Sequence, residues 1–225
     1  MANICIVLGA SGTGKSTSIK TLNPKDTFVI NVLRKRLPFK GSKNIYSKEN
    51  KNYFEPRDYK ELFFYLNNIN EKGTNIKNII IDDAIYLMRK EYFDKCQVLG
   101  YNKYTELAVN FQSLIERCEG MRNDLNIFFF LHQEIIYDGQ NIIGYKVSTV
   151  GKMLDNQYNP IEVVPMVLFA MPQIDKDVVK YGFYTHLKSV NGVTICAKSP
   201  DGMFEDDFIP NDLKYVVDKM NEYYN

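Results

Sequence analysis

Apolar runs alternate with amphipathic stretches through the first part of the chain. Runs at 3–8, 27–32, 76–82 and 126–131 are rich in apolar residues, which is typical of strands buried on both faces. The stretches between them, at about 15–20, 56–72 and 84–122, predict helices. The clearest helical stripe comprises Tyr104, Leu107, Ala108, Phe111, Leu114, Ile115 and Cys118. Strands that alternate with helices predict a mostly parallel sheet covered by helices on both faces.

The second part of the chain has a different pattern. Residues 134–149 read as a hairpin around Asp138 and Gly139, and further strands are predicted at 164–171, 177–188 and 192–198. The last two of these are joined by a turn that contains Gly192. A closing helix follows, capped by Asn211 or Asp212. The pattern therefore predicts a single α/β domain over 1–225, with antiparallel strands in its C-terminal part.

Composition and charge narrow the classes of protein to consider. The 225 residues are 45% hydrophobic and 24% charged, which suits one compact domain with a sizeable core. With 28 basic and 27 acidic residues the net charge is +1, so attraction to nucleic acid must come from a local patch. No apolar run approaches the length of a membrane span, and the first residues lack the basic region of a secretory signal. The four cysteines contain no CxxC pair. We therefore expect reduced thiols, no membrane association and a cytoplasmic protein.

One motif carries most of the chemistry. Residues 9–17 match the phosphate-binding loop G-x-x-x-x-G-K-[ST] without a gap, between a predicted strand and a predicted helix. Glycines allow the backbone N–H groups to approach phosphate oxygens, Lys15 reaches the β- and γ-phosphates, and the Ser16 hydroxyl binds Mg²⁺. The predicted ATP contacts are Gly9, Ala10, Ser11, Gly12, Thr13, Gly14, Lys15, Ser16 and Thr17.

The second half of an ATP site is expected at the end of another strand. The run at 78–81 leads into Asp82 and Asp83. We expect Asp82 to hold Mg²⁺ together with Ser16, and Asp83 to orient or deprotonate the attacking water. Alternatively, the two acids only begin the next helix, where they favour its dipole.

Polar residues also follow the predicted fourth strand. His132 would face the γ-phosphate from a neighbouring strand end, sense its presence and transmit the signal to 134–155. Gln133 is the substitute candidate for this role. The competing interpretation is a partly buried histidine bonded to a backbone carbonyl.

A short basic cluster is the candidate surface for DNA. The stretch from Leu33 to Asn44 contains five cations and no acid, with aromatic residues nearby that could stack on unpaired bases. The alternative is a solvated loop. The predicted DNA-binding residues are Arg34, Lys35, Arg36, Lys40 and Lys43.

The loop 9–17, the strand 79–83 and the histidine after the fourth strand resemble ATPases of the RecA type. More narrowly, the segments 29–32, 37–41, 150–154, 197–204 and 209–213 are similar to short RecA-core proteins of phages, the Sak type, linked to single-strand annealing and recombination. The resemblance covers most of the chain. It implies a RecA-like fold, ATP with Mg²⁺, and single-stranded DNA as partner. It also implies assembly into rings or filaments, and a single-strand binding protein is a further candidate partner.

The resemblance leaves the catalytic base open. RecA-type proteins commonly carry a glutamate at the end of the second strand, but this sequence has Asn31 there. Hydrolysis would then depend on Asp83 or Glu134, or be slow. The family also tends to complete the ATP site with a cation from a neighbouring subunit, for which Lys152 and Lys198 are the positions to test.

Three other functions compete with a DNA-dependent ATPase of phage recombination or replication. A small-molecule or nucleotide kinase shares the phosphate loop, but kinases need a cationic lid and no arginine follows Arg122. A nucleotide-gated binding module that does not hydrolyse ATP would fit the missing glutamate. An AAA-type loader or packaging motor usually has Asp-Glu where this chain has Asp82 and Asp83, and usually adds a helical lid.

Overall fold

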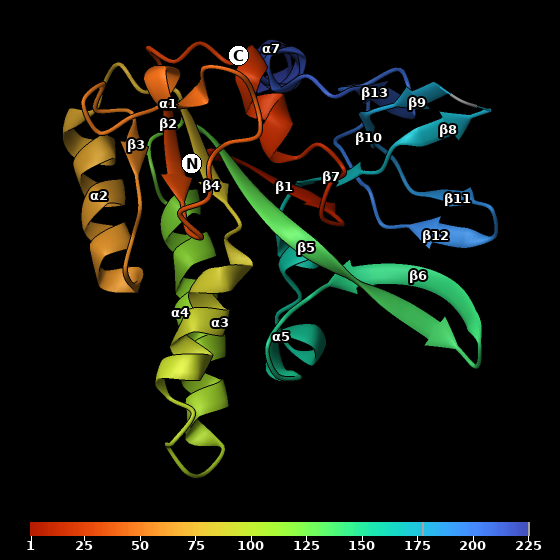
Figure 1. Cartoon of the computed structure of the whole chain (residues 1–225), viewed down its shortest axis with the longest axis horizontal. Coiled ribbons are helices and arrows are strands. Elements are labelled where there is room, and N and C mark those ends of the chain that lie inside the picture. The colour runs from red at the N-terminus through yellow and green to blue at the C-terminus, as the bar shows by residue number, and fades with distance from the viewer. Residues whose placement is uncertain (177, 225) are drawn as a thin grey trace.

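The computed structural model describes residues 1–176 and 178–224 (Figure 1). The N-terminal part folds as an α/β unit in which strands and helices alternate, as predicted. Its elements are β1 (Asn3–Gly9), η1 (Ser16–Thr21), β2 (Thr27–Asn31), α1 (Ser42–Ile45), β3 (Tyr53–Phe54), α2 (Tyr59–Lys72), β4 (Asn78–Asp82), α3 (Ile85–Asp94), α4 (Asn102–Glu119) and β5 (Asn126–Asp138).

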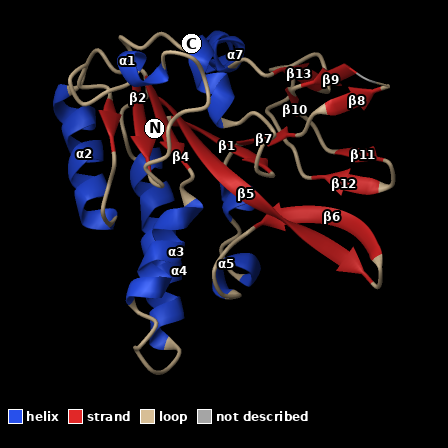
Figure 2. Cartoon of the chain, in the orientation of Figure 1, coloured by secondary structure: helices blue, strands red, loops and turns tan. Residues whose placement is uncertain are grey.

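The C-terminal part consists mainly of short strands and closes with a helix (Figure 2). Its elements are β6 (Asn141–Val147), α5 (Met153–Asn156), α6 (Pro160–Val163), β7 (Met166–Ala170), β8 (Gln173–Asp175), β9 (Val178–Lys180), β10 (Gly182–Tyr184), β11 (Lys188–Val190), β12 (Val193–Ile195), β13 (Phe208–Pro210) and α7 (Leu213–Tyr224).

The central sheet has the order β3-β2-β4-β5-β1-β7-β10-β13. The first six of these strands are parallel, and β10 and β13 run antiparallel to their neighbours. This arrangement confirms the predicted RecA-like α/β fold with an antiparallel C-terminal extension. Strand β5 lies between β1 and β4, so the ends of these three strands meet at one edge of the sheet.

Alternate residues of each central strand bury into two separate cores. In β1, Ile4 and Ile6 pack on the side of α2, α3 and α4, whereas Cys5 and Val7 pack on the side of η1 and α7. The predicted stripe of α4 is buried in the first core, apart from Tyr104, which is partly buried. Burial on both faces explains why these strands are continuous apolar runs rather than alternating ones.

Two helix predictions need correction. The helix expected at about 15–20 is a six-residue 3₁₀ turn, η1, because Leu22 is already extended and Pro24 follows it. The second helix begins at Tyr59 and not at Pro56. Its N-cap is Asp58, whose carboxylate accepts a hydrogen bond from the Glu61 N–H at 2.8 Å.

The fourth predicted strand is longer than expected. Strand β5 continues past Leu131 to Asp138, so His132 and the two residues after it lie within the strand and not beyond its end. The first half of β5 pairs with β1 and β4, and the second half pairs with β6 through the predicted turn at Gly139. The hairpin thus supplies backbone partners where β1 and β4 end, and it extends from the domain as an arm (Figure 1).

The C-terminal strands are shorter than predicted. The run at 164–171 forms β7, and 192–198 contributes only β12. The run at 177–188, whose first position lies outside the described residues, is divided into β9 and β10. The Asn191–Gly192 turn joins β11 to β12, with φ of 52° and 79°, as a tight hairpin requires. Of the two predicted caps, Asp212 accepts a hydrogen bond from the Tyr215 N–H at 3.2 Å.

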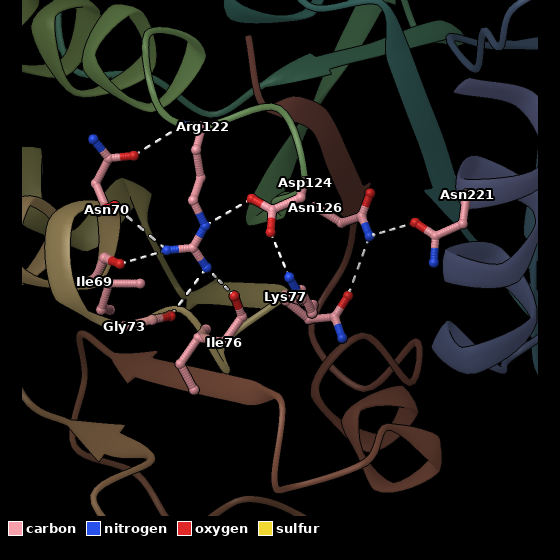
Figure 3. A network of polar contacts seen from close by, with 10 residues as sticks. Ile69, Asn70, Gly73, Ile76, Lys77, Arg122, Asp124, Asn126 and Asn221 are labelled. Carbon is pink, nitrogen blue, oxygen red and sulfur yellow. Dashed lines mark hydrogen bonds and ion pairs between the residues drawn. The ribbon is translucent and has the colours of Figure 1, made fainter. Parts of the chain in front are cut away.

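Arg122 joins the first core to the end of α2 (Figure 3). Its guanidinium donates to the carbonyl oxygens of Ile69, Gly73 and Ile76, and to the carboxylate of Asp124. A half-buried cation that satisfies the last carbonyls of a helix stabilises that terminus. Among the residues that the structure describes, no helix combines the length and apolar character needed to span a bilayer.

Candidate functional site

The loop after β1 holds a buried lysine at its centre. The Lys15 ammonium donates to the carbonyl oxygens of Gly9 and Ala10, both at 2.7 Å, and the residue is 6% exposed. Burial lowers the pKa of Lys15 to about 8, an effect that the nearby Asp83 and Asp82 partly oppose. An anion in the loop would replace the carbonyl contacts and favour the charged ammonium, so the loop suits a phosphate group.

Two glycines of the loop are required by their surroundings. A Cβ at Gly9 would lie 2.4 Å from the carbonyl oxygen of Ala170, on the neighbouring strand β7. Gly14 has a φ of +94°, and a Cβ there would lie 2.7 Å from the amide nitrogen of Asn211 and 3.3 Å from the ring of Tyr181. The motif glycines therefore serve close packing as well as backbone freedom.

Ser16 and Asp82 form the candidate magnesium site. The Ser16 hydroxyl donates to the Asp82 carboxylate at 2.8 Å, which brings two oxygen ligands together beside the loop. Burial, and then the charge of Asp83, raise the pKa of Asp82 to about 7. A divalent cation would stabilise the ionised carboxylate, and Mg²⁺ is commonly held by one or two protein oxygens plus phosphates and water. The residues present therefore fit the ion.

Asp83 is held in an uncommon backbone conformation by two side chains. Its φ is +57°, in the left-handed region that residues other than glycine rarely adopt. One carboxylate oxygen lies 2.7 Å from Nε2 of His132, and the other lies 3.3 Å from the Lys35 ammonium. Burial acts to raise the pKa of Asp83, but the bonds and charges of His132 and Lys35 outweigh it and hold that pKa below its usual value. The carboxylate is therefore ionised at neutral pH and able to accept hydrogen bonds.

These groups share a pocket of about 260 Å³. The pocket brings together the loop after β1, both aspartates where β4 ends, and His132 from the middle of β5. It also receives two residues that were predicted to contact DNA. Its lining consists of Ser11, Gly12, Gly14, Lys15, Ser16, Thr17, Lys35, Arg36, Pro38, Asp82, Asp83 and His132.

The predicted DNA-binding role of the basic cluster stays a prediction, and four of its five residues lie together around one pocket. Lys35 and Arg36 line the phosphate pocket, whereas Arg34 and Lys43 line a second pocket of about 290 Å³, which Lys35 and Arg36 also border. Lys40 is exposed and lines neither of the two. The Asn31 amide donates to the Lys35 carbonyl oxygen at 2.6 Å, which holds the start of this loop beside the pocket. Sequence spacing could not reveal this tertiary contact.

Other candidates lie away from the pocket. His132 lines it, whereas Gln133 does not, because consecutive side chains of a strand point to opposite faces. Glu134 lies on the arm, 3.5 Å from the Lys146 ammonium. Lys198 donates to the carbonyl oxygen of Glu162 at 3.1 Å. Lys152 precedes α5 and is likewise absent from the described pocket lining, so a role for either lysine in a neighbouring subunit stays a prediction.

Two residues next to the loop escaped the sequence analysis. Tyr181 and Asn211 pack against Gly14, and the Asn211 N–H donates to the Tyr181 carbonyl oxygen at 3.2 Å. The amide nitrogen of the Asn211 side chain is buried, with no hydrogen-bond partner among the described residues. The sequence predicts Asn211 as a helix cap, and nothing in its spacing indicates contact with a loop near the start of the chain.

Comparison with known proteins identifies a family. Residues 1–191 match the family described as an AAA domain. The chain is also similar in structure to a KaiC-like protein from the hyperthermophilic archaeon Pyrococcus horikoshii, with a TM-score of 0.45 and 11% sequence identity. That likeness covers 81% of this chain and 77% of the other. No curated protein sequence matches the chain.

The family match bears on the alternatives considered above. One of those alternatives was an AAA-type loader or packaging motor. The match to an AAA domain confirms the broader prediction of a P-loop ATPase. The resemblance to phage proteins of the Sak type stays a prediction.

Proposed function

The chain belongs to the AAA-domain family of P-loop ATPases, and we propose that it hydrolyses ATP slowly unless single-stranded DNA is present. The observation that carries the hydrolytic part is the convergence of Lys15, Asp82 and Asp83 in one pocket. Such a site contains a phosphate cradle, a metal ligand and an ionised carboxylate, which are the parts that phosphoryl transfer to water requires.

Binding follows from the residues of the loop. The backbone N–H groups of 12–17 and the Lys15 ammonium would surround the β- and γ-phosphates. Ser16 and Asp82 would hold Mg²⁺, which offsets the charge of the phosphoryl oxygens when bound. The sugar and base would extend from the loop past Gly14, beside Tyr181 and Asn211.

Asp83 then positions a water molecule in line with the γ-phosphate. The water oxygen attacks phosphorus, the bond to the β–γ bridging oxygen breaks, and ADP leaves with that electron pair. Asp83 accepts the proton of the attacking water and later returns it to solvent or to the phosphate formed. The depressed pKa of Asp83 makes it a weak base. A weak base fits slow turnover, as does Asn31 at the position where RecA-type proteins commonly have a glutamate.

His132 connects this site to the arm. The Ser148 N–H donates to the His132 carbonyl oxygen at 2.8 Å, at the base of the β5–β6 hairpin. Loss of the γ-phosphate would change the contacts of the His132 ring, and the change would pass along β5. Because 134–155 is built as a hairpin and the short helix α5, the response would be a movement of the arm rather than its ordering.

DNA binding and assembly rest on the resemblance and on exposed charge. Arg34 and Lys40 on the loop after β2, and Lys43 in α1, are exposed cations and could neutralise phosphates of a single strand. Self-assembly into a ring or filament, a single-strand binding protein as partner, and action in phage recombination within the host cytoplasm belong to the same proposal. In such an assembly, Lys152 or Lys198 of one subunit could complete the ATP site of its neighbour.

One assay tests the proposal. Phosphate release from Mg²⁺·ATP is measured with and without single-stranded DNA, for the wild type and for the Lys15→Ala variant. We expect release that DNA stimulates, and loss of both tight ATP binding and turnover in the variant. Near-normal ATP affinity in Lys15→Ala would contradict the assignment of the loop, whereas turnover indifferent to DNA would remove only the DNA part.

A kinase deserves a control in the same assay. No arginine follows Arg122 in the sequence, but Arg34 and Arg36 line the pocket that adjoins the phosphate site and could supply the cations a kinase needs. Small phosphorylated acceptors and nucleosides are therefore added in parallel. Transfer of ³²P from ATP to such an acceptor would replace the ATPase proposal, and tight ATP binding without any turnover would favour a gated binding module.

A further inference from the structure

The side chain of Lys35 reaches the phosphate pocket from a loop outside the P-loop. Its ammonium lies 3.3 Å from the second carboxylate oxygen of Asp83 and 5.7 Å from the centre of the Tyr86 ring. The hydrogen bond from Asn31 to the Lys35 carbonyl fixes the backbone beside the end of β2. A cation is therefore delivered to the pocket by the chain itself.

We propose that Lys35 is a cation for the γ-phosphate, supplied in cis, and that it leaves Asp83 when ATP binds. This inference rests on the proposed function and names a further residue of the same site. The Lys35 side chain is 61% exposed, whereas that of Asp83 is 12% exposed, so the lysine is the partner that can move. Its flexible four-carbon stem allows the ammonium to exchange one oxyanion for another nearby.

The exchange would couple recognition of ATP to activation of the base. Before ATP binds, His132 occupies one oxygen of Asp83 and Lys35 occupies the other. A γ-phosphate carries more charge than a carboxylate and would attract the ammonium, which frees one Asp83 oxygen for water. ADP lacks the γ-phosphate, so Lys35 would stay on Asp83.

This role differs from that of Lys15. Lys15 is almost fully buried within the loop and contacts its carbonyls, so it serves any nucleotide that carries a β-phosphate. Lys35 lines the same pocket, but its side chain is exposed and its ammonium contacts the Asp83 carboxylate rather than the loop carbonyls. A cation held beside Asp83 would meet the terminal phosphate and the charge that develops there during transfer.

The test compares affinities for Mg²⁺·ATP and Mg²⁺·ADP by calorimetry without DNA. For Lys35→Ala we expect affinity for ATP to fall at least about ten-fold, the usual loss for a charged hydrogen bond, while affinity for ADP stays within about two-fold. Lys35→Arg should keep most of the preference for ATP. Lys60→Ala removes an exposed lysine of α2 that lines neither pocket, and should behave as the wild type.

Each outcome separates this inference from the proposed function. If the wild type fails to bind Mg²⁺·ATP, the proposed function is wrong. If the wild type binds it and Lys35→Ala keeps the wild-type ratio of ATP to ADP affinity, only the role of Lys35 is overturned. Melting temperatures of all variants are measured, and Lys35→Gln, which keeps a polar side chain of similar length, replaces the alanine variant if that variant unfolds.

Discussion

His132 lies midway along β5 and Asp83 directly follows β4, and Nε2 of the imidazole lies 2.7 Å from the aspartate carboxylate. The pair forms because β5 lies beside β4 in the sheet, which brings its residue 132 level with the turn after Asp82. An ionised carboxylate can only accept, so Nε2 carries the hydrogen and donates it. The pair links the residue proposed to position water with the strand that continues into the arm.

Replacing Asp83 by Asn should separate binding from turnover. The amide keeps the size of the side chain, and Asn tolerates the left-handed φ of +57° well, so the fold and ATP affinity should persist. It cannot accept a proton from water, and we expect turnover to fall by about 10²–10⁴-fold. Phosphate release under single-turnover conditions measures this. Unchanged turnover would remove Asp83 from the role of base.

Replacing His132 by Ala should move the pH dependence of turnover. The hydrogen bond from His132 is one of the causes of the depressed pKa of Asp83, so its loss should raise that pKa toward the usual value. A base must be ionised to act, and activity is therefore lost as pH falls through its pKa. We expect the acidic limb of the kcat profile to shift to higher pH in the variant. A limb at the wild-type position, with folding intact, would show that the histidine does not tune Asp83.

Replacing Asp82 by Asn should stabilise the nucleotide-free protein while weakening its use of magnesium. Burial raises the pKa of Asp82 to about 7, so between its unfolded value and pH 7 the folded state binds the extra proton. This carboxylate therefore lowers stability as pH rises through that range and costs most above pH 7. At pH 8 we expect the free energy of unfolding to rise by about 1–2 kcal/mol in the variant.

Urea titrations at pH 5 and pH 8 check this prediction. The increase in the free energy of unfolding caused by Asp82→Asn should be smaller at pH 5, where Asp82 of the wild type is protonated. Mg²⁺-dependent ATP binding is measured on the same samples. A variant that is less stable at pH 8, or that keeps full Mg²⁺ dependence, would contradict the assignment of Asp82.

Replacing Gly9 by Ala should destabilise the fold through packing. The added methyl would lie 2.4 Å from the backbone oxygen of Ala170, and neither central strand can shift freely. We expect a loss of about 1–3 kcal/mol, as for other overpacked sites. Gly120→Ala is the matched control: its new Cβ would meet only ordinary contacts at 3.6 Å, and its φ of −70° suits alanine. Equal stabilities in denaturant titrations would show that the approach of β7 to β1 is looser than described.

The sequence by itself determined the α/β class and the chemistry of the phosphate loop. Both depend on local patterns: apolar runs mark strands buried on two faces, and the spacing of Gly9, Gly14 and Lys15 is a contiguous motif. Asp82 and Asp83 could be predicted beside the phosphate loop because they follow an apolar run, and the carboxyl ends of parallel strands share one edge of the sheet.

Only the tertiary structure decided where the basic loop lies and how far the fourth strand extends. The loop after β2 brings Lys35 and Arg36 into the pocket of the phosphate-binding loop, and its start is held there by a contact between Asn31 and the backbone of Lys35 that no periodicity encodes. Strand β5 continues beyond His132 because β6 supplies partners for its backbone. The packing of Asn211 against Gly14 likewise joins residues nearly two hundred positions apart. Charge and propensity are local properties, whereas the partner that a side chain meets depends on how the whole chain is arranged.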